Sequence, residues 1–267
     1  MPVHNFASSI RHGASGASAS SFYSFQITNS LRFDADDESG LRWGGDSGTL
    51  GTPTHNDKCT WSAWIKRGII GNDYQNIIHA FTGSHGINTA FDENGTDDTL
   101  GINTANSVGG GDSTHVFRDA ANWFHLVIAW DTTQGSNNDR LKVYVNGTEL
   151  DEFNESISQN QNVSYNESGN QHWIGRNSSN GYGFDGYMAD INFIDGQQLA
   201  PTSFGETKNG IWIPIDTASL TFGNNGYRLE FKSSGSLGTD TSGEGNNFGL
   251  NGIAADHQTL DSPTFGD

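Results

Sequence analysis

One short acidic loop holds the densest group of oxygen-bearing side chains in the sequence. The segment DENGTDD, residues 92–98, supplies Asp92, Asn94, Asp97 and Asp98. Carboxylate and amide oxygens are the ligands that Ca²⁺ takes in proteins, so this loop is a candidate calcium site. Its spacing differs from that of an EF-hand loop, and a solvated acidic turn is the alternative interpretation. The stretch FDADDESG, residues 33–40, is a weaker candidate of the same kind.

A second group of candidates consists of aromatic and amide residues that can hold a sugar. The candidate glycan-binding residues are Trp130, Trp173, Asn177 and Tyr182, and Trp64 is a further tryptophan of this kind. Aromatic rings offer flat apolar faces to sugar rings, and amides exchange hydrogen bonds with hydroxyl groups. The segment NSSNGYGFD, residues 177–185, combines both kinds of group. The alternative is that these rings fill the core or pack against a neighbouring subunit.

The residues that can act as acids, bases or nucleophiles show no pattern typical of an enzyme. His125 lies within an apolar stretch, which favours a hydrogen-bonded sheet histidine over a general base. Asp190 and Asp195 are an odd number of positions apart, so a regular strand would point them to opposite faces. The single cysteine, Cys59, is predicted to be a small buried hydrophobe. The histidines have no metal-ligand spacing, and no nucleophile elbow is present.

The net charge limits the partners that this chain can have. Its 13 Lys and Arg residues against 31 Asp and Glu residues give a net charge of −18. Such a surface repels phosphate backbones and anionic lipids, so we expect neither a nucleic-acid nor a membrane partner. The acidity suits solubility, cation binding or a crowded assembly. The first residues lack the apolar core of a signal peptide, and no segment is apolar enough to span a bilayer.

The elements that must position these residues are short strands joined by polar turns, as 35 glycines suggest. In CTWSAWIKR, residues 59–67, the alternation predicts a half-buried strand with Trp64 on its second face. NWFHLVIAWD, residues 122–131, is apolar on both faces. It suits a central strand covered on both sides, or a sandwich strand with an aromatic outer face. Asn146-Gly147 favours a two-residue type I′ hairpin turn.

Further strands are expected in several stretches, and together they predict an antiparallel β-sandwich. The stretches lie within residues 21–34, 75–83, 87–91, 99–103, 172–177, 184–199 and, after residue 200, GIWIPID and YRLEF. A capping signal in APTSFGE allows one short helix near residues 198–206. Residues 1–20 are too small and polar to order alone, so they are either a free tail or an arm that orders against a partner.

Five of these segments, taken in order, resemble the laminin-G-like, or concanavalin-A-like, jelly roll. They are TWSAWIKR, NWFHLVIAWD, LKVYVNGTEL, HWIGR and FDGYMADINFIDGQQL. The flanking segments further resemble structural proteins of tailed bacteriophages, especially those of marine and cyanobacterial hosts. These segments are YSFQITNSLRFD, IDGQQLAPTSFGE, GIWIP, GNNGYRLEF, SGEGNNF and DSPT. Many such relatives continue beyond DSPT, whereas this chain stops at Asp267.

The resemblance implies an all-β jelly-roll sandwich with an N-terminal arm. Residues 1–30 would be the arm, used for anchoring or oligomerisation. Residues 31–200 would form the lectin-like domain, and residues 201–267 a C-terminal extension packed on the sandwich. The implied role is a virion structural protein displayed on the particle surface, as a head decoration, head fibre or tail-fibre component, with weak glycan binding. The implied location is the virion, assembled in the host cytoplasm.

The implied partners are capsid or tail proteins contacted through the arm, a host surface glycan and other copies of the chain. A homotrimer is favoured by family analogy. The alternatives are a receptor-binding carbohydrate adhesin of the tail or a polysaccharide-degrading enzyme. Laminarinase-like hydrolases of this fold carry a Glu-x-Asp-x-x-Glu or Glu-x-Asp-x-Glu strand, which is lacking here, so we expect no enzyme. Lectin-like jelly rolls often bind Ca²⁺ in loops such as residues 92–98, and no other cofactor is expected.

Overall fold

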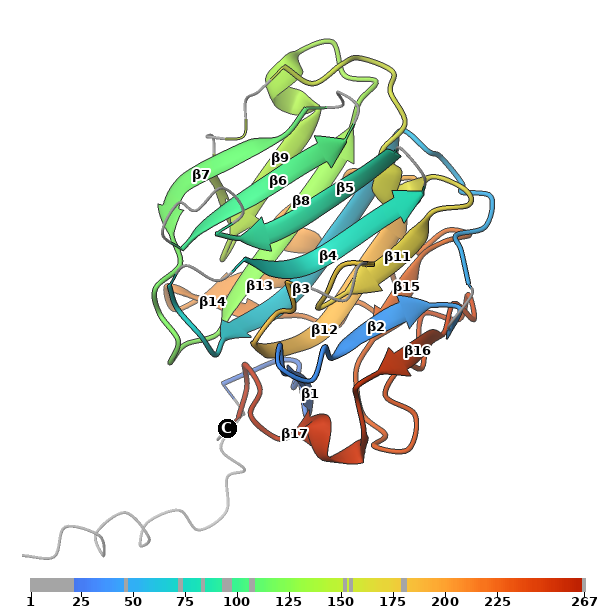
Figure 1. Cartoon of the computed structure of the whole chain (residues 1–267). Coiled ribbons are helices and arrows are strands. Elements are labelled where there is room, and N and C mark those ends of the chain that lie inside the picture. Colours follow the sequence, from blue (N-terminus) through green and yellow to red (C-terminus); the bar gives the residue numbers. More distant parts are fainter. Residues whose placement is uncertain are drawn as a thin grey trace, which may run out of the picture.

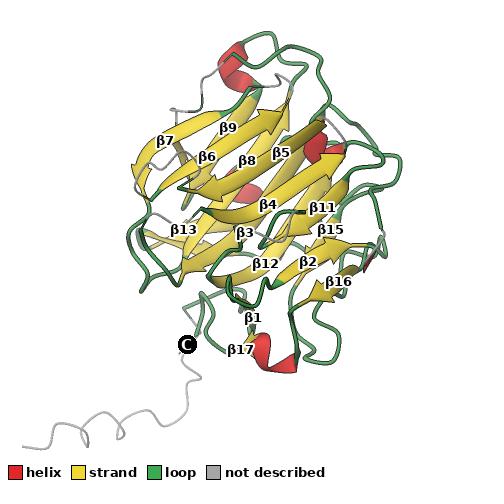
Figure 2. Cartoon of the chain, in the orientation of Figure 1, coloured by secondary structure: helices red, strands yellow, loops and turns green. Residues whose placement is uncertain are grey.

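Two antiparallel sheets packed face to face form the body of the molecule (Figure 1). The structure is a computed structural model. It describes residues 22–45, 48–71, 74–82, 85–92, 98–105, 109–150, 153, 156–178 and 182–265. Strands dominate these residues, and their helical turns are short (Figure 2). The turns are the 3₁₀ helices η3 (Asn137–Asp139), η4 (Ser164–Asn166), η5 (Pro201–Ser203) and η6 (Ala255–His257).

Sheet A has eight strands among the described residues. Its order is β10 (Thr148–Leu150), β9 (Leu141–Val145), β8 (Phe124–Asp131), β3 (Lys58–Arg67), β12 (Gly186–Asp195), β1 (Ser30–Phe33) and β17 (Gln258–Thr259). β15 (Tyr227–Leu229) also pairs with β12. Asn146 and Gly147 form the two-residue turn between β9 and β10 with φ of 48° and 79°, which confirms the predicted type of hairpin.

Sheet B has seven strands in the described part of the chain. Its order is β16 (Phe248–Asn251), β2 (Gly40–Trp43), β11 (Gln171–Ile174), β4 (Gln75–Thr82), β5 (His85–Phe91), β6 (Thr99–Ala105) and β7 (Gly111–Val116). Figure 1 presents this sheet face-on, in front of sheet A. A separate hairpin joins β13 (Gly205–Lys208) to β14 (Ile211–Pro214). The chain after residue 200 therefore contributes strands to both sheets.

The core lies between the inner faces of the two sheets. The alternation predicted for residues 59–67 is present, because Cys59, Trp61, Ala63 and Ile65 all point into this core. On β8 the inward residues are Leu126, Ile128 and Trp130, each fully buried. Burying side chains of this size is worth roughly 1.5–3 kcal/mol each, which makes this layer the main source of stability.

The outer face of sheet A is also covered. Val127 and Ile194 pack against Phe204 and Phe222, which come from the chain beyond residue 200. Trp64 and Ala189 pack with Ile27, and Phe25, Trp123 and Trp212 close the same cluster. β8 is thus a central strand covered on both sides, whereas the expectation that β3 is only half-buried was wrong. Residues 25–29, placed in the predicted arm, belong structurally to this cover.

The predicted helix near residues 198–206 is reduced to the 3₁₀ turn η5. Pro201 opens the turn, and its fixed φ suits the first helical position. The chain then enters β13 at Gly205, so the segment delivers the covering hairpin instead of forming a longer helix. No helix in the described residues is long and apolar enough to cross a bilayer.

Candidate functional site

The outer face of sheet B differs from that of sheet A because no helix or strand of the described residues lies across it. A row of outward side chains crosses it through paired positions. Arg42 on β2 pairs with Trp173 on β11, Trp173 with His79 on β4, His79 with Asn88 on β5, and Asn88 with Asn103 on β6. Alternate residues of each strand point inward to the core, so this row is set by the period of two.

A shallow hollow of about 270 Å³ lies over this row. It is lined by Tyr74, His79, Phe81, Gly86, Ile87, Asn88, Asn103 and Asn177. The Asn88 amide donates to the Tyr74 hydroxyl, which fixes both groups at the rim. The His79 ring stacks on Phe81 with ring centroids 5.9 Å apart. The hollow therefore offers rings and amides together.

A second hollow of about 400 Å³ adjoins the first and shares Tyr74 with it. Tyr182 stands between solvent and Tyr74, with their ring centroids 4.6 Å apart, and its side chain is 61% exposed. Its φ of 60° is unusual for an aromatic residue, and such outliers gather at functional sites. Asp36 and Asp185 also line this second hollow. Burial, followed by the nearby charge of Asp34, raises the pKa of Asp185.

Among the described residues that line the first hollow there is no acidic side chain, although the chain has 31 acidic residues. The one imidazole ring of this described lining, that of His79, is kept neutral because burial lowers the pKa of His79 to about 4. A neutral imidazole, three amides and aromatic rings exchange hydrogen bonds and stacking contacts with hydroxyl-rich molecules. The lining gives an anionic ligand no charged partner.

The structure places the four predicted glycan-binding residues in different surroundings. Asn177 and Tyr182 line the hollows, so the structure brings them together. Trp173 lies on the same face, but its ring is held between the guanidinium groups of Arg42 and Arg176, each 5.1 Å from the centroid. With 6% exposure it has no open face for a sugar. The prediction that Trp130 binds a glycan was wrong, because its ring is fully buried in the core between the sheets.

The predicted calcium loop is described at its two ends. Asp92 and Asp98 are buried, and Arg67 forms ion pairs with both, at 3.3 and 2.8 Å. Burial opposes ionisation of Asp98, but hydrogen bonds from Gly71 and Arg118 and the charge of Arg67 together hold its pKa below its ordinary value. Arginine therefore already neutralises these two carboxylates.

Asn94 and Asp97, the other two candidate ligands of that loop, lie outside the described residues. Calcium binding by the loop thus stays a prediction. Among the residues that the structure does describe, no three His, Cys, Asp or Glu side chains are grouped as a metal ion requires.

The buried His125 is engaged with neutral partners. One ring nitrogen, Nδ1, accepts a hydrogen bond from Trp212 Nε1 at 3.1 Å. Its other nitrogen, Nε2, lies 2.8 Å from the Ser62 hydroxyl. Because Nδ1 accepts, a neutral ring carries its proton on Nε2 and donates to Ser62, so it cannot take a proton from the serine. Burial also lowers the pKa of His125 to about 3.

The remaining acid and thiol candidates have structural surroundings. Asp190 sits at a β-bulge of β12 with φ of 44° and pairs with Arg228 at 2.9 Å, so the regular alternation assumed from the sequence fails there. Asp195 accepts hydrogen bonds from the backbone of Thr54 and Asn225. Cys59 lies in the core, and burial raises the pKa of its thiol, as suits a packed hydrophobe.

Sequence reasoning missed Tyr74, His79, Asn88 and Asn103. TLGINTA does alternate Leu100 and Ile102 with Gly101 and Asn103, which predicts two faces, whereas QNIIHAFT has adjacent apolar residues and a register shift between Asn76 and Ile78. That alternation does not reveal that the polar positions of separate strands stand opposite one another. Their assembly depends on the register between β4, β5 and β6.

A family model for the concanavalin A-like lectin/glucanases superfamily matches residues 42–202. The match spans more than half of the chain, and the chain therefore belongs to this superfamily. The predicted fold, an all-β sandwich of the concanavalin-A-like or laminin-G-like kind, is confirmed. No curated protein matches the chain.

Solved structures show the same fold at low identity. A candidate carbohydrate-binding protein from Bacteroides ovatus is 19% identical, with a TM-score of 0.57 over 90% of this chain and 62% of its own. A heptameric SAP-like pentraxin from Limulus polyphemus is 16% identical, with a TM-score of 0.46 over 66% of this chain and 80% of its own.

The enzymatically active domain of tailspike protein 2 of bacteriophage CBA120 is also similar. It is 14% identical, with a TM-score of 0.43 over 66% of this chain and 26% of its own. Likenesses at this level do not indicate what this chain binds or whether it is an enzyme.

Proposed function

We propose that the outer face of sheet B binds an uncharged glycan and that this lectin-like domain is not an enzyme. The observation that carries the proposal is the hollow lined by rings and amides, without an acidic side chain, on the open face of an acidic protein. Sugar rings present apolar C–H faces and hydroxyl groups, which need aromatic rings and hydrogen-bonding amides. The two adjoining hollows share Tyr74, so one ligand several sugars long can occupy both.

The local charge favours a neutral ligand. Asp36 and Asp185 beside the second hollow would repel an anionic polysaccharide. Arg176 on the same face donates to the backbone carbonyl of Glu38 and is held there. A neutral polysaccharide needs no charged partner and would bind through rings and amides alone.

A non-catalytic role is supported by the candidate acid and base groups of the strands and by the first hollow, whose described lining has no carboxyl group; Asp36 and Asp185 line only the second hollow. His125 donates towards Ser62, and Asp190 is paired with Arg228. Retaining glycosidases need two carboxyl groups about 5 Å apart that face one substrate. We infer that the chain binds without cleaving, as an adhesive module does.

Titration with soluble polysaccharides tests this proposal. The probes are a neutral glucan, a neutral galactan and a uronic-acid polymer, measured by isothermal titration calorimetry. We expect a neutral polymer to bind and Tyr182→Ala to weaken that binding about tenfold. Ile211→Ala is the matched control, because Ile211 is 55% exposed on β14, on the covered side of the molecule.

Binding of the uronic-acid polymer alone, or equal binding by both variants, would refute the site. Release of reducing ends during a long incubation would refute the non-catalytic assignment and revive the polysaccharide-degrading alternative.

We further propose that this domain lies on the surface of a tailed-phage virion, as part of a decoration or fibre protein. The support is the sequence resemblance of the segments that flank the jelly roll. Residues 1–21 would then reach capsid or tail proteins, and a trimer is the default assembly. The alternative is a tail adhesin that recognises its host through the same glycan site.

Co-sedimentation of the full chain with phage heads lacking it, and separately with tails, distinguishes the two settings. Removal of residues 1–21 is the matched variant, because residues 25–29 pack on the domain. Binding to heads that is lost on removal would place the protein there. Binding to tails, together with retention on host cells, would indicate the adhesin.

A further inference from the structure

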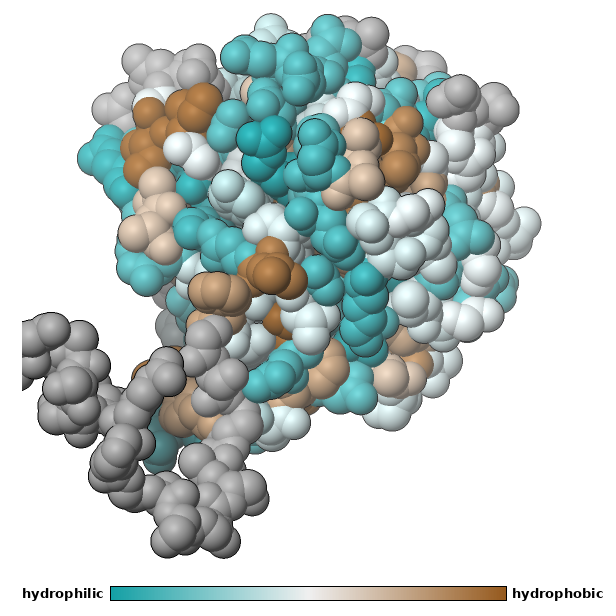
Figure 3. Space-filling view, turned by 90° about the horizontal axis from the view of Figure 1, so that it is seen from below, coloured by the Kyte–Doolittle hydropathy of each residue, from teal (hydrophilic) through white to brown (hydrophobic). Residues whose placement is uncertain are grey.

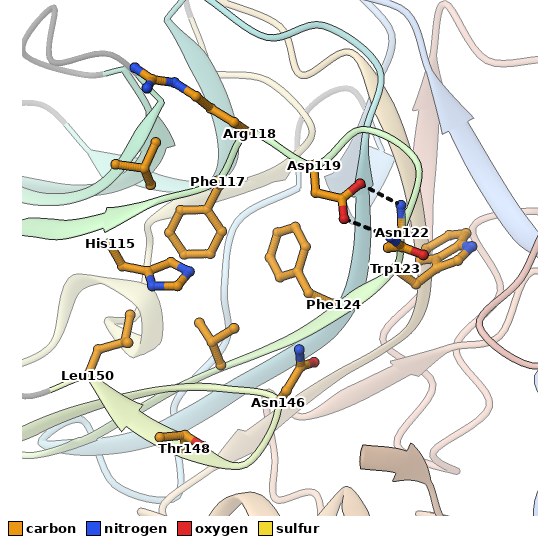
Figure 4. Close-up of a pocket in the computed structure, with 12 residues that line it drawn as sticks. His115, Phe117, Arg118, Asp119, Asn122, Trp123, Phe124, Asn146, Thr148 and Leu150 are labelled. Atoms are coloured by element: carbon orange, nitrogen blue, oxygen red, sulfur yellow. Dashed lines mark hydrogen bonds between the residues drawn. The ribbon is translucent and has the colours of Figure 1, made fainter. Parts of the chain in front are cut away.

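A larger cavity, of about 460 Å³, lies on a different part of the molecule. It opens between the edge strand β7 of sheet B and strands β8, β9 and β10 of sheet A. Figure 4 shows the rings of Phe117 and Phe124 side by side within it, with His115 and Leu150 along one side. The two phenylalanine centroids are 5.1 Å apart. The volume is within the usual range of ligand pockets, roughly 300–1,000 Å³.

The lining of this pocket is mainly apolar and reaches solvent. Val116, Val145 and Leu150 join the two phenylalanines, and Val116 is 40% exposed. Asp119, Asn122 and Thr148 form a polar rim, with Asp119 accepting hydrogen bonds from Asn122 (Figure 4). In the view from below, apolar surface occurs as separate patches among hydrophilic residues (Figure 3). Because polar residues border the apolar lining of the pocket, a compact apolar occupant fits it better than a broad flat partner.

We propose that this occupant is the N-terminal segment of the same chain, with Val3, Phe6 and Ile10 as its anchors. These three and Met1 are the only bulky apolar residues in residues 1–21, which lie outside the described part of the chain. They stand at i, i+3 and i+7, the spacing with which a helix presents side chains to an apolar groove.

The first described residues are held on the outer cover of sheet A. The carbonyl of Phe22 accepts a hydrogen bond from Lys208, and Ser24 donates to Glu206 at 3.0 Å. Phe25 packs against the same cluster as Trp123, and Trp123 also lines the pocket. The first described residues therefore pack on the same outer cluster as Trp123, one of the residues that line the cavity.

The length of the connecting segment permits this docking. Residues 11–21, RHGASGASASS, separate the last anchor from Phe22, and eleven extended residues reach at most about 40 Å. A short tether of this kind raises the effective concentration of the anchors at the pocket to the millimolar range. Weak apolar contacts are then enough to fill the pocket within one chain, so in the free protein the segment docks on its own domain before it reaches any virion partner.

The charges of the two parts are complementary. Residues 1–21 contain Arg11 and no acidic residue, whereas the whole chain carries 13 basic and 31 acidic residues. Asp119 on the pocket rim is fully exposed, and Arg11 directly follows the last anchor. An arginine there meets a carboxylate as the anchors enter the pocket, although such an exposed pair contributes little by itself.

Photo-crosslinking in the full-length protein tests the inference. Phe6 is replaced by p-benzoylphenylalanine, the protein is irradiated, and the crosslinked peptides are identified by mass spectrometry. We expect the main crosslinks to fall on residues 115–124 and 145–150. Val116→Arg should lower their yield at least about tenfold, because it places a charge at the mouth of an apolar pocket. Ile211→Arg, at another exposed apolar position, should leave the yield unchanged.

An equal mixture of ¹⁴N- and ¹⁵N-labelled protein separates docking within a chain from docking between chains. Crosslinks that join peptides of one label only support the proposal. Mixed-label crosslinks would overturn it by assigning the pocket to the arm of a second copy. Crosslinks scattered over the surface, or a yield that Val116→Arg does not change, would overturn it as well. None of these outcomes depends on glycan binding.

Discussion

The two sheets present outer faces that are built in the same way and used differently. Both alternate inward core residues with outward residues along each strand. On sheet A the outward residues include Trp64, Val127 and Ile194, and the ends of the chain cover them. On sheet B they include His79, Asn88 and Asn103, and no helix or strand of the described residues covers them.

The difference shows that the kind of outward residue decides whether a sheet face becomes a packing surface or a binding surface. When the outward residues are apolar, a second layer can cover them without burying polar groups. The covering then stabilises the fold by roughly 25 cal/mol per Å² of apolar area removed from water. Amides and a neutral imidazole would lose hydrogen bonds with water under such a layer, so they remain accessible to a polar ligand. Each variant below changes one face and compares it with the other.

The largest effect is expected from truncating the cover of sheet A. Phe204 is 1% exposed and packs on Val127 and Ile194. Phe204→Ala leaves a cavity and should lower the free energy of unfolding by about 3–5 kcal/mol. Phe81→Ala is the counterpart on the open face, where the half-buried ring should cost less than half as much. Urea unfolding of both variants measures the comparison, and equal losses would contradict it.

A smaller loss is expected where the turn between β9 and β10 meets the cover. Gly147 has φ of 79°, and a Cβ there would lie 2.5 Å from the ring of Trp212. Gly147→Ala combines left-handed strain with displacement of this ring and should cost about 2–3 kcal/mol. Gly210→Ala, at φ of 83° with open space around it, adds strain alone and should cost about 1 kcal/mol. Equal urea-unfolding midpoints for the two variants would show that the Trp212 ring moves aside without a cost in stability.

The two histidines on the outer faces, His125 and His79, should contribute differently to the pH dependence of the protein's stability. Burial lowers the pKa of His125 to about 3 and that of His79 to about 4, from an unfolded value near 6.5. The unfolded chain therefore binds more protons below pH 6.5, and stability present above that pH is lost as the pH falls. For His125 the loss is about 2 kcal/mol between pH 6.5 and 5 and continues to about pH 3.

Unfolding measured from pH 7.5 to 4.5 in the wild type and His125→Gln tests this dependence. The variant should show a shallower slope, by about one proton. An unchanged slope would mean that His125 is already protonated in the folded protein.

The sequence predicted most of the fold because its strongest signals are local. The two apolar faces of residues 122–131 indicated either a layer on each side, which the structure has, or an aromatic outer face, and Asn146-Gly147 indicated a tight turn. β7, with the sequence GDSTHV, was missed because it has no apolar alternation and is held by pairing with β6. The bulge at Asp190 was missed because a register shift leaves no mark in the residue period.

The candidate site was predictable only in part. Asn177 and Tyr182 belong to one loop whose composition indicates ligand binding. The alternation of β8 already placed Trp130 with Leu126 and Ile128, so its burial could have been predicted. The row through His79, Asn88 and Asn103 could not, because it exists only once non-local strands pair in register.

The smallest effect on stability, and the sharpest on binding, is expected from Asn103→Asp. Asn103 is exposed on β6 and lines the hollow. The substitution keeps the shape and adds a carboxylate, so the free energy of unfolding should change by less than about 0.5 kcal/mol. Affinity for the neutral glycan should fall about threefold, because one amide donor is lost and a charge must be desolvated. Asn209→Asp, in the turn between β13 and β14, is the matched control and should bind as the wild type does.

The sign, the size and the salt dependence of the change together identify the kind of ligand. An anionic glycan would lose far more affinity to Asn103→Asp, and added salt would restore much of the loss by screening the new charge. A glycan held through a cation would gain affinity, because a carboxylate is a better ligand for Ca²⁺ than an amide. A modest loss that salt does not change is expected only if the open face of sheet B recognises its ligand through neutral rings and amides. Titrations at low and high salt with both variants therefore separate the three kinds of ligand.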